Sequence, residues 1–325
     1  MTTKIAWCDE VWNPVTGCTP VSEGCSRCYA AGVAKRFWKG REFSSIRFHP
    51  DRLRKPEHWG KSRRIFVNSM GDLFHEDVSD EMIGQVFAEM SIAGWHTFLV
   101  LTKRPERMRR WMDTQEAKIT YFERGGNPLR NVYLGVTAES QAMADECIPI
   151  LLETPAALRF VSIEPQLEAV DLDYYLPDEG EMYGAFPGGD PREWRPDEEV
   201  NTEAEMAAYK KACAEWDAGV GVDVGTSHRW LTDEQGNLAG WGTVTPYGLG
   251  VYSYKQEGLS WVICGAESGP KRRPFDPDWV RSLRDQCQAA GVPFFLKQIH
   301  DENGRVVHMP ELDGAVHNAF PEVQS

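Results

Sequence analysis

The sequence predicts an α/β fold, a partial or full (β/α) barrel with a large insertion between its fifth and sixth strands. Two observations predict this fold. Short apolar runs recur along the 325 residues, and stretches with helical periodicity lie between most of them. The runs are apolar throughout, as is typical of parallel strands that are buried on both faces. An open doubly wound sheet has the same periodicity, so the pattern leaves closure of the barrel open.

Six runs are expected to be strands: Ile65–Asn68, Thr97–Thr102, Val132–Val136, Leu158–Glu164, Trp261–Gly265 and Pro293–Lys297. Three stretches are expected to be helices: Ser79–Ala93, Ser140–Leu152 and Asp276–Ala290. The first helix starts with a capping serine, Ser79, and then repeats apolar residues at helical spacing. The last helix opens with Asp276 and Pro277 and stops before Gly291.

Polar side chains follow almost every expected strand. They are Asn68, Thr102, Lys103, Arg104, Thr137, Glu164, Glu267, Lys297 and Gln298, with Gly265 and Ala266 beside Glu267. The carboxyl ends of parallel strands meet at one edge of a sheet or barrel, where ligands bind. We therefore expect these residues to surround a substrate-binding mouth.

Residues 171–258 interrupt the alternation of strands and helices. This segment has 18 acidic residues against 6 basic ones, and it contains Trp194, Trp216, Trp230 and Trp241. Disordered linkers carry few aromatic residues, so a folded segment is expected here. We interpret 1–170 and 259–325 as the barrel and 171–258 as an acidic, aromatic-rich cap over its mouth.

The composition is that of a globular protein, with 42% hydrophobic and 26% charged residues. No run of 18 or more apolar residues exists, so neither a membrane span nor a membrane partner is expected. The first residues lack the pattern of a signal peptide, and a cytoplasmic location is expected. In that compartment, the eight cysteines are expected to be thiols or metal ligands.

The net charge of −14 argues against a protein that coats nucleic acid non-specifically. Positive charge is nevertheless concentrated in the first 130 residues. The run from Arg41 to Arg64 holds eight Lys and Arg residues against three acidic ones, and a second group lies at Lys103–Arg110. Such runs are either solvated surface or a face directed at phosphates.

Three cysteines, Cys18, Cys25 and Cys28, lie close together in the segment GCTPVSEGCSRCY. Glycine and proline in this segment allow it to bend and bring three thiolates together. Three thiolates can hold a 4Fe–4S cluster and leave one iron without a protein ligand. That iron can bind a small molecule, such as the amino and carboxylate groups of S-adenosylmethionine (SAM).

Other interpretations of these cysteines stay open. A structural zinc ion would need a fourth ligand, for which Cys8 and His49 are candidates. A redox pair of Cys25 and Cys28 would lack the usual preceding strand and following helix. The cysteines could also have no ligand role.

Seven blocks of the sequence resemble a phage-associated family of three-cysteine, radical-SAM-like proteins. In chain order they are WNPVTGCTPVSEGCSRCYA, VNSMGDLFH, LTKRPER, LGVTAES, LRFVSIEP, WVICGAESGPKRRPF and LRDQCQAAGVPFFLKQ. Only the 171–258 region lies outside them. The resemblance implies a barrel of the radical SAM type and, for a phage-encoded chain, a location in the host cytoplasm.

The resemblance also implies the cofactors, a 4Fe–4S cluster and SAM, and an electron-donor protein as a partner. In such enzymes the reduced cluster splits SAM, and the resulting 5′-deoxyadenosyl radical abstracts a hydrogen atom from the substrate. Most of them have the spacing C-x₃-C-x₂-C with an aromatic residue before the third cysteine. Here the first gap has six residues, Arg27 takes the aromatic position, and Tyr29 is the residue expected beside adenine.

The resemblance assigns further roles to strand-end residues. Asn68 and Ser69 are expected at the methionine part of SAM, where Gly71 permits close backbone approach, and a simple turn is the alternative. Lys103 and Arg104 are expected at a carboxylate or phosphate, and capping of the barrel rim is the alternative. Glu164 is expected at the ribose, although a salt bridge to Arg104 or Lys297 is an alternative. Gly265 and Glu267 are expected near adenine. Cys264 is either a hydrogen-atom donor to a substrate radical or a small core residue.

A related enzyme of some phages rearranges amino acids attached to 5-hydroxymethyluracil in DNA. The resemblance therefore implies an isomerase that acts on an amino-acid-modified thymidine in phage DNA. A free nucleotide or small metabolite is the alternative substrate. A zinc-stabilised nucleic-acid-binding protein without catalytic activity and a SAM-independent iron–sulfur nuclease are the alternatives from other classes.

Overall fold

The structure is a computed structural model that describes residues 3, 5–123, 126–185, 227–232, 238–244, 249–256, 258–269 and 271–321. The chain divides into two compact units. The first comprises Met1–Leu176 and Gly258–Ser325, and the second comprises Pro177–Glu257. Among the described residues, no helix is both long enough and apolar enough to cross a membrane.

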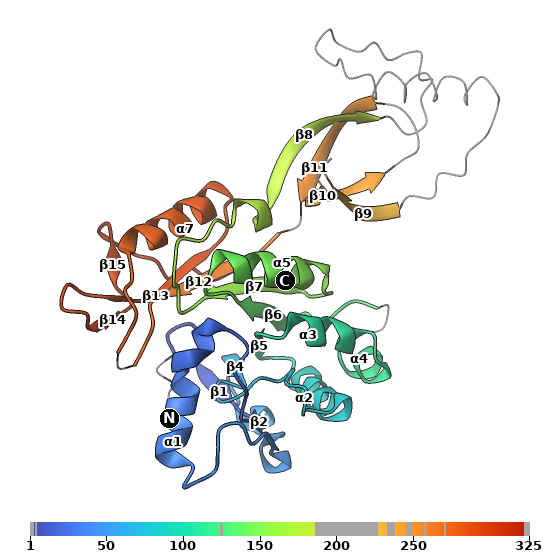
Figure 1. Cartoon of the computed structure of the whole chain (residues 1–325). Helices are drawn as coiled ribbons and strands as arrows, with labels where there is room; N and C mark the ends of the chain where they lie inside the picture. Colours follow the sequence, from blue (N-terminus) through green and yellow to red (C-terminus); the bar gives the residue numbers. More distant parts are fainter. Residues whose placement is uncertain are drawn as a thin grey trace. The chain divides into compact units, whose positions relative to one another are not determined.

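An eight-stranded sheet forms the centre of the first unit (Figure 1). Its order is β1 (Glu10–Trp12), β4 (Arg64–Val67), β5 (Thr97–Thr102), β6 (Val132–Thr137), β7 (Leu158–Ile163), β12 (Trp261–Gly265), β13 (Phe294–His300) and β14 (Val306–His308). The first seven strands are parallel, and β14 is antiparallel to β13. Within the described residues no ladder joins β1 to β14, so the predicted α/β fold is confirmed as a partial barrel.

In the described part of the chain, the helices that accompany the strands are α1 (Tyr29–Phe37), α2 (Asp80–Ile92), α3 (Pro105–Met112), α4 (Gln115–Thr120), α5 (Gln141–Glu153) and α7 (Pro277–Ala289). Short 3₁₀ turns are η1 (Glu23–Arg27), η2 (Pro50–Arg52), η3 (Pro56–His58) and η4 (Asp173–Tyr175). The three predicted helices are present as α2, α5 and α7. The predicted caps of α2 and α7 are present too, because the side chains of Ser79 and Asp276 accept hydrogen bonds from the first turns. Ser140 caps α5 in the same way.

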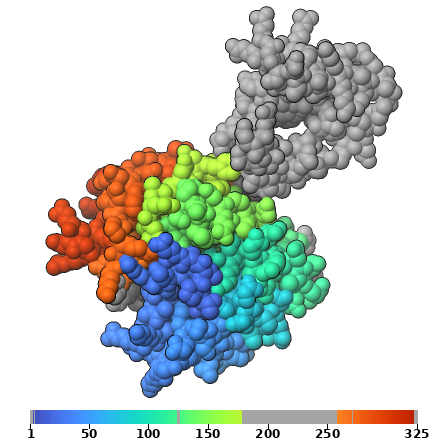
Figure 2. Space-filling model, viewed as in Figure 1, coloured from blue at the N-terminus to red at the C-terminus, as the bar shows by residue number. Residues whose placement is uncertain are grey.

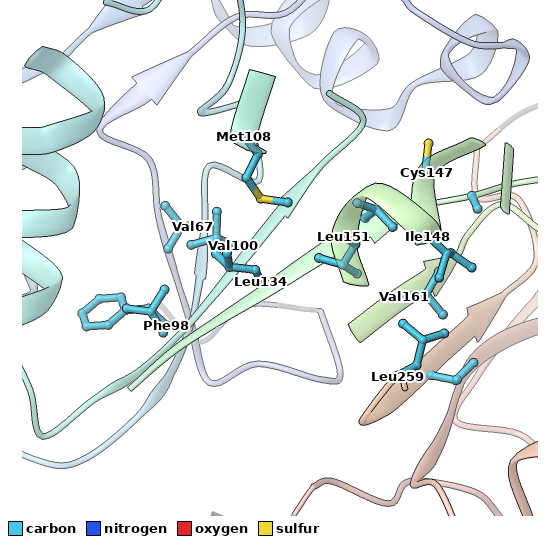
Figure 3. Close-up of a cluster of buried hydrophobic side chains, with 14 of the residues drawn as sticks. Val67, Phe98, Val100, Met108, Leu134, Cys147, Ile148, Leu151, Val161 and Leu259 are labelled. Atoms are coloured by element: carbon cyan, nitrogen blue, oxygen red, sulfur yellow. The ribbon is translucent and has the colours of Figure 1, made fainter. Parts of the chain in front are cut away.

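Successive side chains along a strand lie on opposite faces of the sheet, so they belong to two different hydrophobic clusters. Ile65 and Val67 of β4 belong to the larger cluster, which includes residues of α2, α3, α5 and α7, whereas Phe66 belongs to the smaller one. Figure 3 shows Ile148 and Leu151 of α5 in the larger cluster, near Val161. Because both faces are buried, the strands read as continuous apolar runs in the sequence.

Two-stranded ladders lie outside the main sheet. In the first unit, β2 (Val15–Thr16) pairs with β3 (Arg47–Phe48), and β15 (Glu311–Leu312) pairs with β16 (Ala315–Val316). In the second unit, β8 (Asp178–Ala185) pairs with β11 (Leu249–Gln256), and β9 (Ser227–Thr232) pairs with β10 (Leu238–Val244), both antiparallel.

The second unit falls between β7 and β12, the fifth and sixth strands of the sheet, where the insertion was predicted. Trp194, Trp216 and the helix-like stretch 201–219 lie outside the described residues. The cap over the mouth therefore stays a prediction. In the space-filling view, the N-terminal residues (blue) and the C-terminal residues (red) both lie on the surface of the first unit (Figure 2).

Candidate functional site

A pocket of about 220 Å³ lies at the carboxyl ends of the parallel strands in the first unit. Its polar lining includes Cys18, Cys25, Cys28, Tyr29, Asn68, Ser69, Asp72, Lys103, Arg104, Thr137, Glu164, Glu267 and Lys297. Trp7, Phe66 and Leu101 supply apolar surface to the same pocket. The structure thus brings the cysteine segment and most of the predicted strand-end residues to one place.

The three cysteines are half-buried free thiols. Cys25 lies in η1, and Cys28 is the N-cap of α1, with its backbone N–H donating to the Cys25 carbonyl at 3.1 Å. Among the described residues, no three His, Cys, Asp or Glu side chains converge on a point that suits a single metal ion. In a 4Fe–4S cluster each cysteine binds a different iron, so the three thiols need only face a shared space. Their common pocket fits this requirement.

The proposed fourth ligands of a zinc site do not line the pocket. Cys8 is buried, and burial raises the pKa of its thiol to about 12. His49 is hydrogen-bonded through Nε2 to Thr16 Oγ1 at 2.8 Å. The arrangement therefore favours a cluster with three protein ligands over a four-ligand zinc ion.

Glu139 and Lys103 hold the middle of the cysteine segment. The Glu139 carboxylate accepts a hydrogen bond from the Gly24 backbone N–H at 2.8 Å and pairs with Lys103 Nζ. Lys103 also donates to Ser22 Oγ at 3.1 Å. Burial alone would raise the pKa of Glu139, but the charge of Lys103 and these hydrogen bonds outweigh it and lower that pKa. Lys103, expected at a ligand anion, is thus already paired with a protein carboxylate.

Arg104 holds the first cysteine. Its Nη1 lies 3.4 Å from Cys18 Sγ and 3.0 Å from Asp72 Oδ2, and its Nη2 donates to the Thr19 carbonyl at 3.0 Å. Burial raises the pKa of Cys18 to about 11, and Asp72 adds to this effect while Arg104 opposes it. The free thiol is therefore protonated at neutral pH, and a metal must displace this proton when it binds.

Asn68 lines the pocket and has an unused hydrogen-bond donor. Its Oδ1 accepts from the Val15 backbone N–H at 3.1 Å, which identifies the other end of the amide as Nδ2. Asn68 is 3% exposed, and Nδ2 has no hydrogen-bond partner among the residues that the structure describes. A buried, unpaired donor is costly, so Nδ2 is suited to bind an acceptor group of a ligand.

The loop after β4 is tied to the cysteine segment and α1. The Tyr29 hydroxyl donates to the Ser69 carbonyl at 2.6 Å, while the side chain as a whole is 45% exposed. A Cβ atom at Gly71 would lie 2.9 Å from the Gly17 carbonyl oxygen. Close backbone approach at Gly71 was predicted, but the neighbour is the cysteine segment of the protein itself.

Glu164 pairs with Lys297 across the mouth of the pocket. The two side chains are 16% and 13% exposed. The salt bridge that the sequence offered as an alternative for Glu164 is therefore present, with Lys297 as the partner. Arg104, the other candidate partner, pairs with Asp72 instead.

Glu267 lines the pocket but is held by two arginines. Its carboxylate pairs with Arg273 at 2.5 Å and with Arg27 of the cysteine segment at 3.1 Å. Burial alone would raise the pKa of Glu267, but the hydrogen bonds and charge of Arg273 lower it overall. Gly265 is absent from the pocket lining, and a Cβ atom there would meet only ordinary contacts at 3.5 Å.

Cys264 lies in the larger hydrophobic cluster and is fully buried. Its thiol donates to Gln166 Oε1 at 3.1 Å, and burial raises its pKa well above the usual value. It does not line the pocket. These contacts match the core interpretation of Cys264 rather than that of a hydrogen-atom donor.

Most arginines of the two basic runs are paired within the protein. The shortest contacts are Arg54–Glu57 at 2.6 Å, Arg63–Glu10 at 2.5 Å and Arg107–Asp80 at 2.5 Å. Arg64 pairs with Asp9, and Arg41 binds the Thr16 and Ser45 carbonyls. These contacts favour the solvated-surface interpretation over a face that binds phosphates.

Sequence reasoning missed Asp72, Glu139 and Arg273. Asp72 and Glu139 have their partners far away along the chain, 32 residues for Asp72 and Arg104 and 36 for Glu139 and Lys103, whereas Arg273 pairs with Glu267 six residues away. The available signal was their position, because Asp72 and Glu139 come shortly after strands whose neighbouring residues were already candidates.

Comparison with protein families finds one match along nearly the whole chain. Residues 2–321 match DUF5131, described as a protein of unknown function. The chain belongs to this family. No curated protein matches the sequence.

Solved structures include similar chains of spore photoproduct lyase. A cysteine-to-serine mutant matches with a TM-score of 0.39 and 11% identity over 89% of this chain and 76% of the other. A double mutant with bound AdoMet and dinucleoside spore photoproduct matches with a TM-score of 0.38 and 10% identity, over 88% and 75%.

Proposed function

We propose that this protein is a radical SAM enzyme. The observation that carries the proposal is the common pocket of Cys18, Cys25 and Cys28, whose lining, among the residues that the structure describes, has no fourth cysteine. Three thiolates leave one iron of a 4Fe–4S cluster open to a ligand. When bound, the cluster supplies the electron that splits SAM into methionine and a 5′-deoxyadenosyl radical.

The residues around the cysteines suit a ligand with the polarity of SAM. We assign the carboxylate of the methionine part to Asn68 Nδ2, a buried donor that has no partner among the described residues. The half-exposed ring of Tyr29 offers a flat surface to adenine. Glu164 and Lys297 offer one acceptor and one donor beyond their own pair, for ribose hydroxyls or substrate.

Metal analysis after anaerobic reconstitution tests the cluster. Wild-type protein should bind about four irons per chain, and Cys18→Ala, Cys25→Ala or Cys28→Ala should each abolish or severely deplete them. Cys8→Ala and Cys147→Ala are matched controls, because both residues are buried away from the pocket. A Cys8→Ala protein without iron would contradict the three-cysteine assignment.

For the substrate, we propose the amino-acid-modified thymidine that the family resemblance implies, with a radical rearrangement as the reaction. Most arginines of the basic runs are paired within the protein, so fewer cations are available to bind a DNA duplex. The corresponding free nucleotide is therefore the main competing substrate.

Product analysis separates the two substrates. Reduced enzyme and SAM are incubated with modified phage-type DNA or with the corresponding free nucleotide, and nucleosides are then compared by chromatographic retention. A rearranged nucleoside from the DNA alone supports the DNA substrate. Equal 5′-deoxyadenosine with and without DNA, and no shifted nucleoside, would eliminate it.

A further inference from the structure

Helix α1 exposes an apolar stripe directly after the third cysteine. Tyr29, Val33 and Phe37 lie four residues apart, so they share one face of the helix, and they are 45%, 39% and 62% exposed. The neighbouring face of α1 buries Ala30 and Ala34. These exposed fractions show that the described part of the chain leaves the stripe largely uncovered.

The segment that carries this stripe is rich in basic residues. Between Gly24 and Arg41 the sequence has no acidic residue and five basic ones: Arg27, Lys35, Arg36, Lys39 and Arg41. Lys35, Arg36 and Lys39 are exposed. This local balance contrasts with the net charge of −14 for the whole chain. The face therefore attracts an acidic partner that the rest of the surface repels.

The stripe begins at the cluster site. Tyr29 follows Cys28 directly and lines the same pocket, so a partner on this face would lie close to the cluster. Resting on the proposed function, we propose that the α1 face, Tyr29, Val33 and Phe37 with Lys35, Arg36 and Lys39, docks an acidic electron-transfer protein. One electron leaves the donor, which is oxidised by one electron, and enters the cluster, which is reduced by one electron.

The form of this face matches a transient protein contact. An apolar centre with a charged rim is the usual composition of protein interfaces, and electron-transfer encounters use small ones. A duplex would instead meet mostly polar and cationic groups. Arg41 stacks on Trp38 at 4.0 Å and Arg36 lies over Phe37 at 5.2 Å, so both guanidinium groups are partly engaged.

Stopped-flow reduction of the reconstituted full-length protein tests this proposal. The donor probe is a reduced flavodoxin, and the comparison reductant is dithionite. Val33→Ser/Phe37→Ser removes the apolar side chains of the stripe without a change of charge. Lys35→Glu/Arg36→Glu replaces two positive charges beside the stripe with two negative ones. Lys118→Glu/Ile119→Ser on α4 is the matched control, because both residues are exposed there.

Both α1 variants should be reduced by flavodoxin at least about tenfold more slowly than wild type, with the charge variant losing most of its salt dependence. Dithionite should reduce Val33→Ser/Phe37→Ser at the wild-type rate. Flavodoxin should reduce the control variant Lys118→Glu/Ile119→Ser at the wild-type rate. Flavodoxin rates within about twofold of wild type in both α1 variants would overturn the docking site. So would a loss of DNA binding or of self-association in place of the slower reduction.

Iron content is measured first on every protein. A wild-type chain without iron would contradict the proposed function and the docking site together. A chain with its cluster and unchanged flavodoxin rates would contradict the docking site alone.

Discussion

At the scale of single residues, the site combines charged side chains that have ion-pair partners with one buried donor that has no hydrogen-bond partner among the described residues. Lys103, Glu267 and Glu164 all have ion-pair partners inside the protein. Asn68 Nδ2 has no partner among the described residues, although Asn68 is more deeply buried than these three. Paired charges hold the pocket in shape, whereas an unpaired donor is stabilised only when a ligand arrives.

Replacing Asn68 with Asp should weaken SAM binding. The Oδ1 that accepts from Val15 is kept, while the free donor becomes an acceptor that repels the SAM carboxylate. A hydrogen bond to a charged group contributes about 1.5–3 kcal/mol, so roughly tenfold to 150-fold weaker binding is expected. Equilibrium binding to the cluster-loaded protein measures this change, and unchanged affinity with intact iron would remove Asn68 from the site.

Arg104 should raise the reduction potential of the cluster. Its Nη1 lies 3.4 Å from Cys18 Sγ, and hydrogen bonds to cluster sulfurs are among the factors that set this potential. The double variant Asp72→Asn/Arg104→Gln removes the buried pair together and avoids leaving one charge uncompensated. A redox titration should give a more negative potential than in wild type, and an equal potential would show that Arg104 only packs the loop.

At the scale of elements, tertiary contacts decide what the local pattern leaves open. Helices α2, α5 and α7 were predicted from apolar spacing and caps, because both signals are local. Strand β1 has three residues, too few to show a pattern, and it is defined by its pairing with β4. The contact of α2 with η3 likewise creates a buried carboxyl that no local pattern marks.

Glu89 on α2 should make stability depend on pH. Burial and then the neighbouring Glu57 raise the pKa of Glu89 from 4.5 to about 7, and its Oε1 has no hydrogen-bond partner. The stability that protonated Glu89 contributes to the folded state is fully present below the pKa of the unfolded chain. It is lost as pH rises through about 7, the pKa in the folded state. Glu89→Gln should therefore be more stable than wild type at about pH 8, with a smaller gain at about pH 5.

Urea unfolding midpoints at both pH values measure this difference. Glu146→Gln on α5 is the matched control, because Glu146 is exposed, and it should follow wild type at both pH values. A Glu89→Gln protein with the same pH dependence as wild type would show that Glu89 is ionised in the folded state.

At the scale of the whole molecule, the sequence predicted which residues gather at the mouth but not how they are paired. Strand ends are predictable because parallel strands place them at one edge. Arg27 and Glu267 are 240 residues apart, and only the assembled sheet shows that they meet. For the same reason, the expected ligand roles of Lys103 and Glu267 could not be weighed against internal salt bridges.

Electron paramagnetic resonance of the reduced protein, with and without SAM, tests the central claim most directly. An iron that lacks a protein ligand can bind SAM, so the spectrum of the reduced cluster should change when SAM is added. At SAM concentrations that just saturate wild type, the change should be smaller in an Asn68→Asp protein, because its weaker binding leaves part of the clusters without SAM. A reduced cluster whose spectrum is identical with and without SAM, or a protein that binds zinc and no iron, would contradict the account.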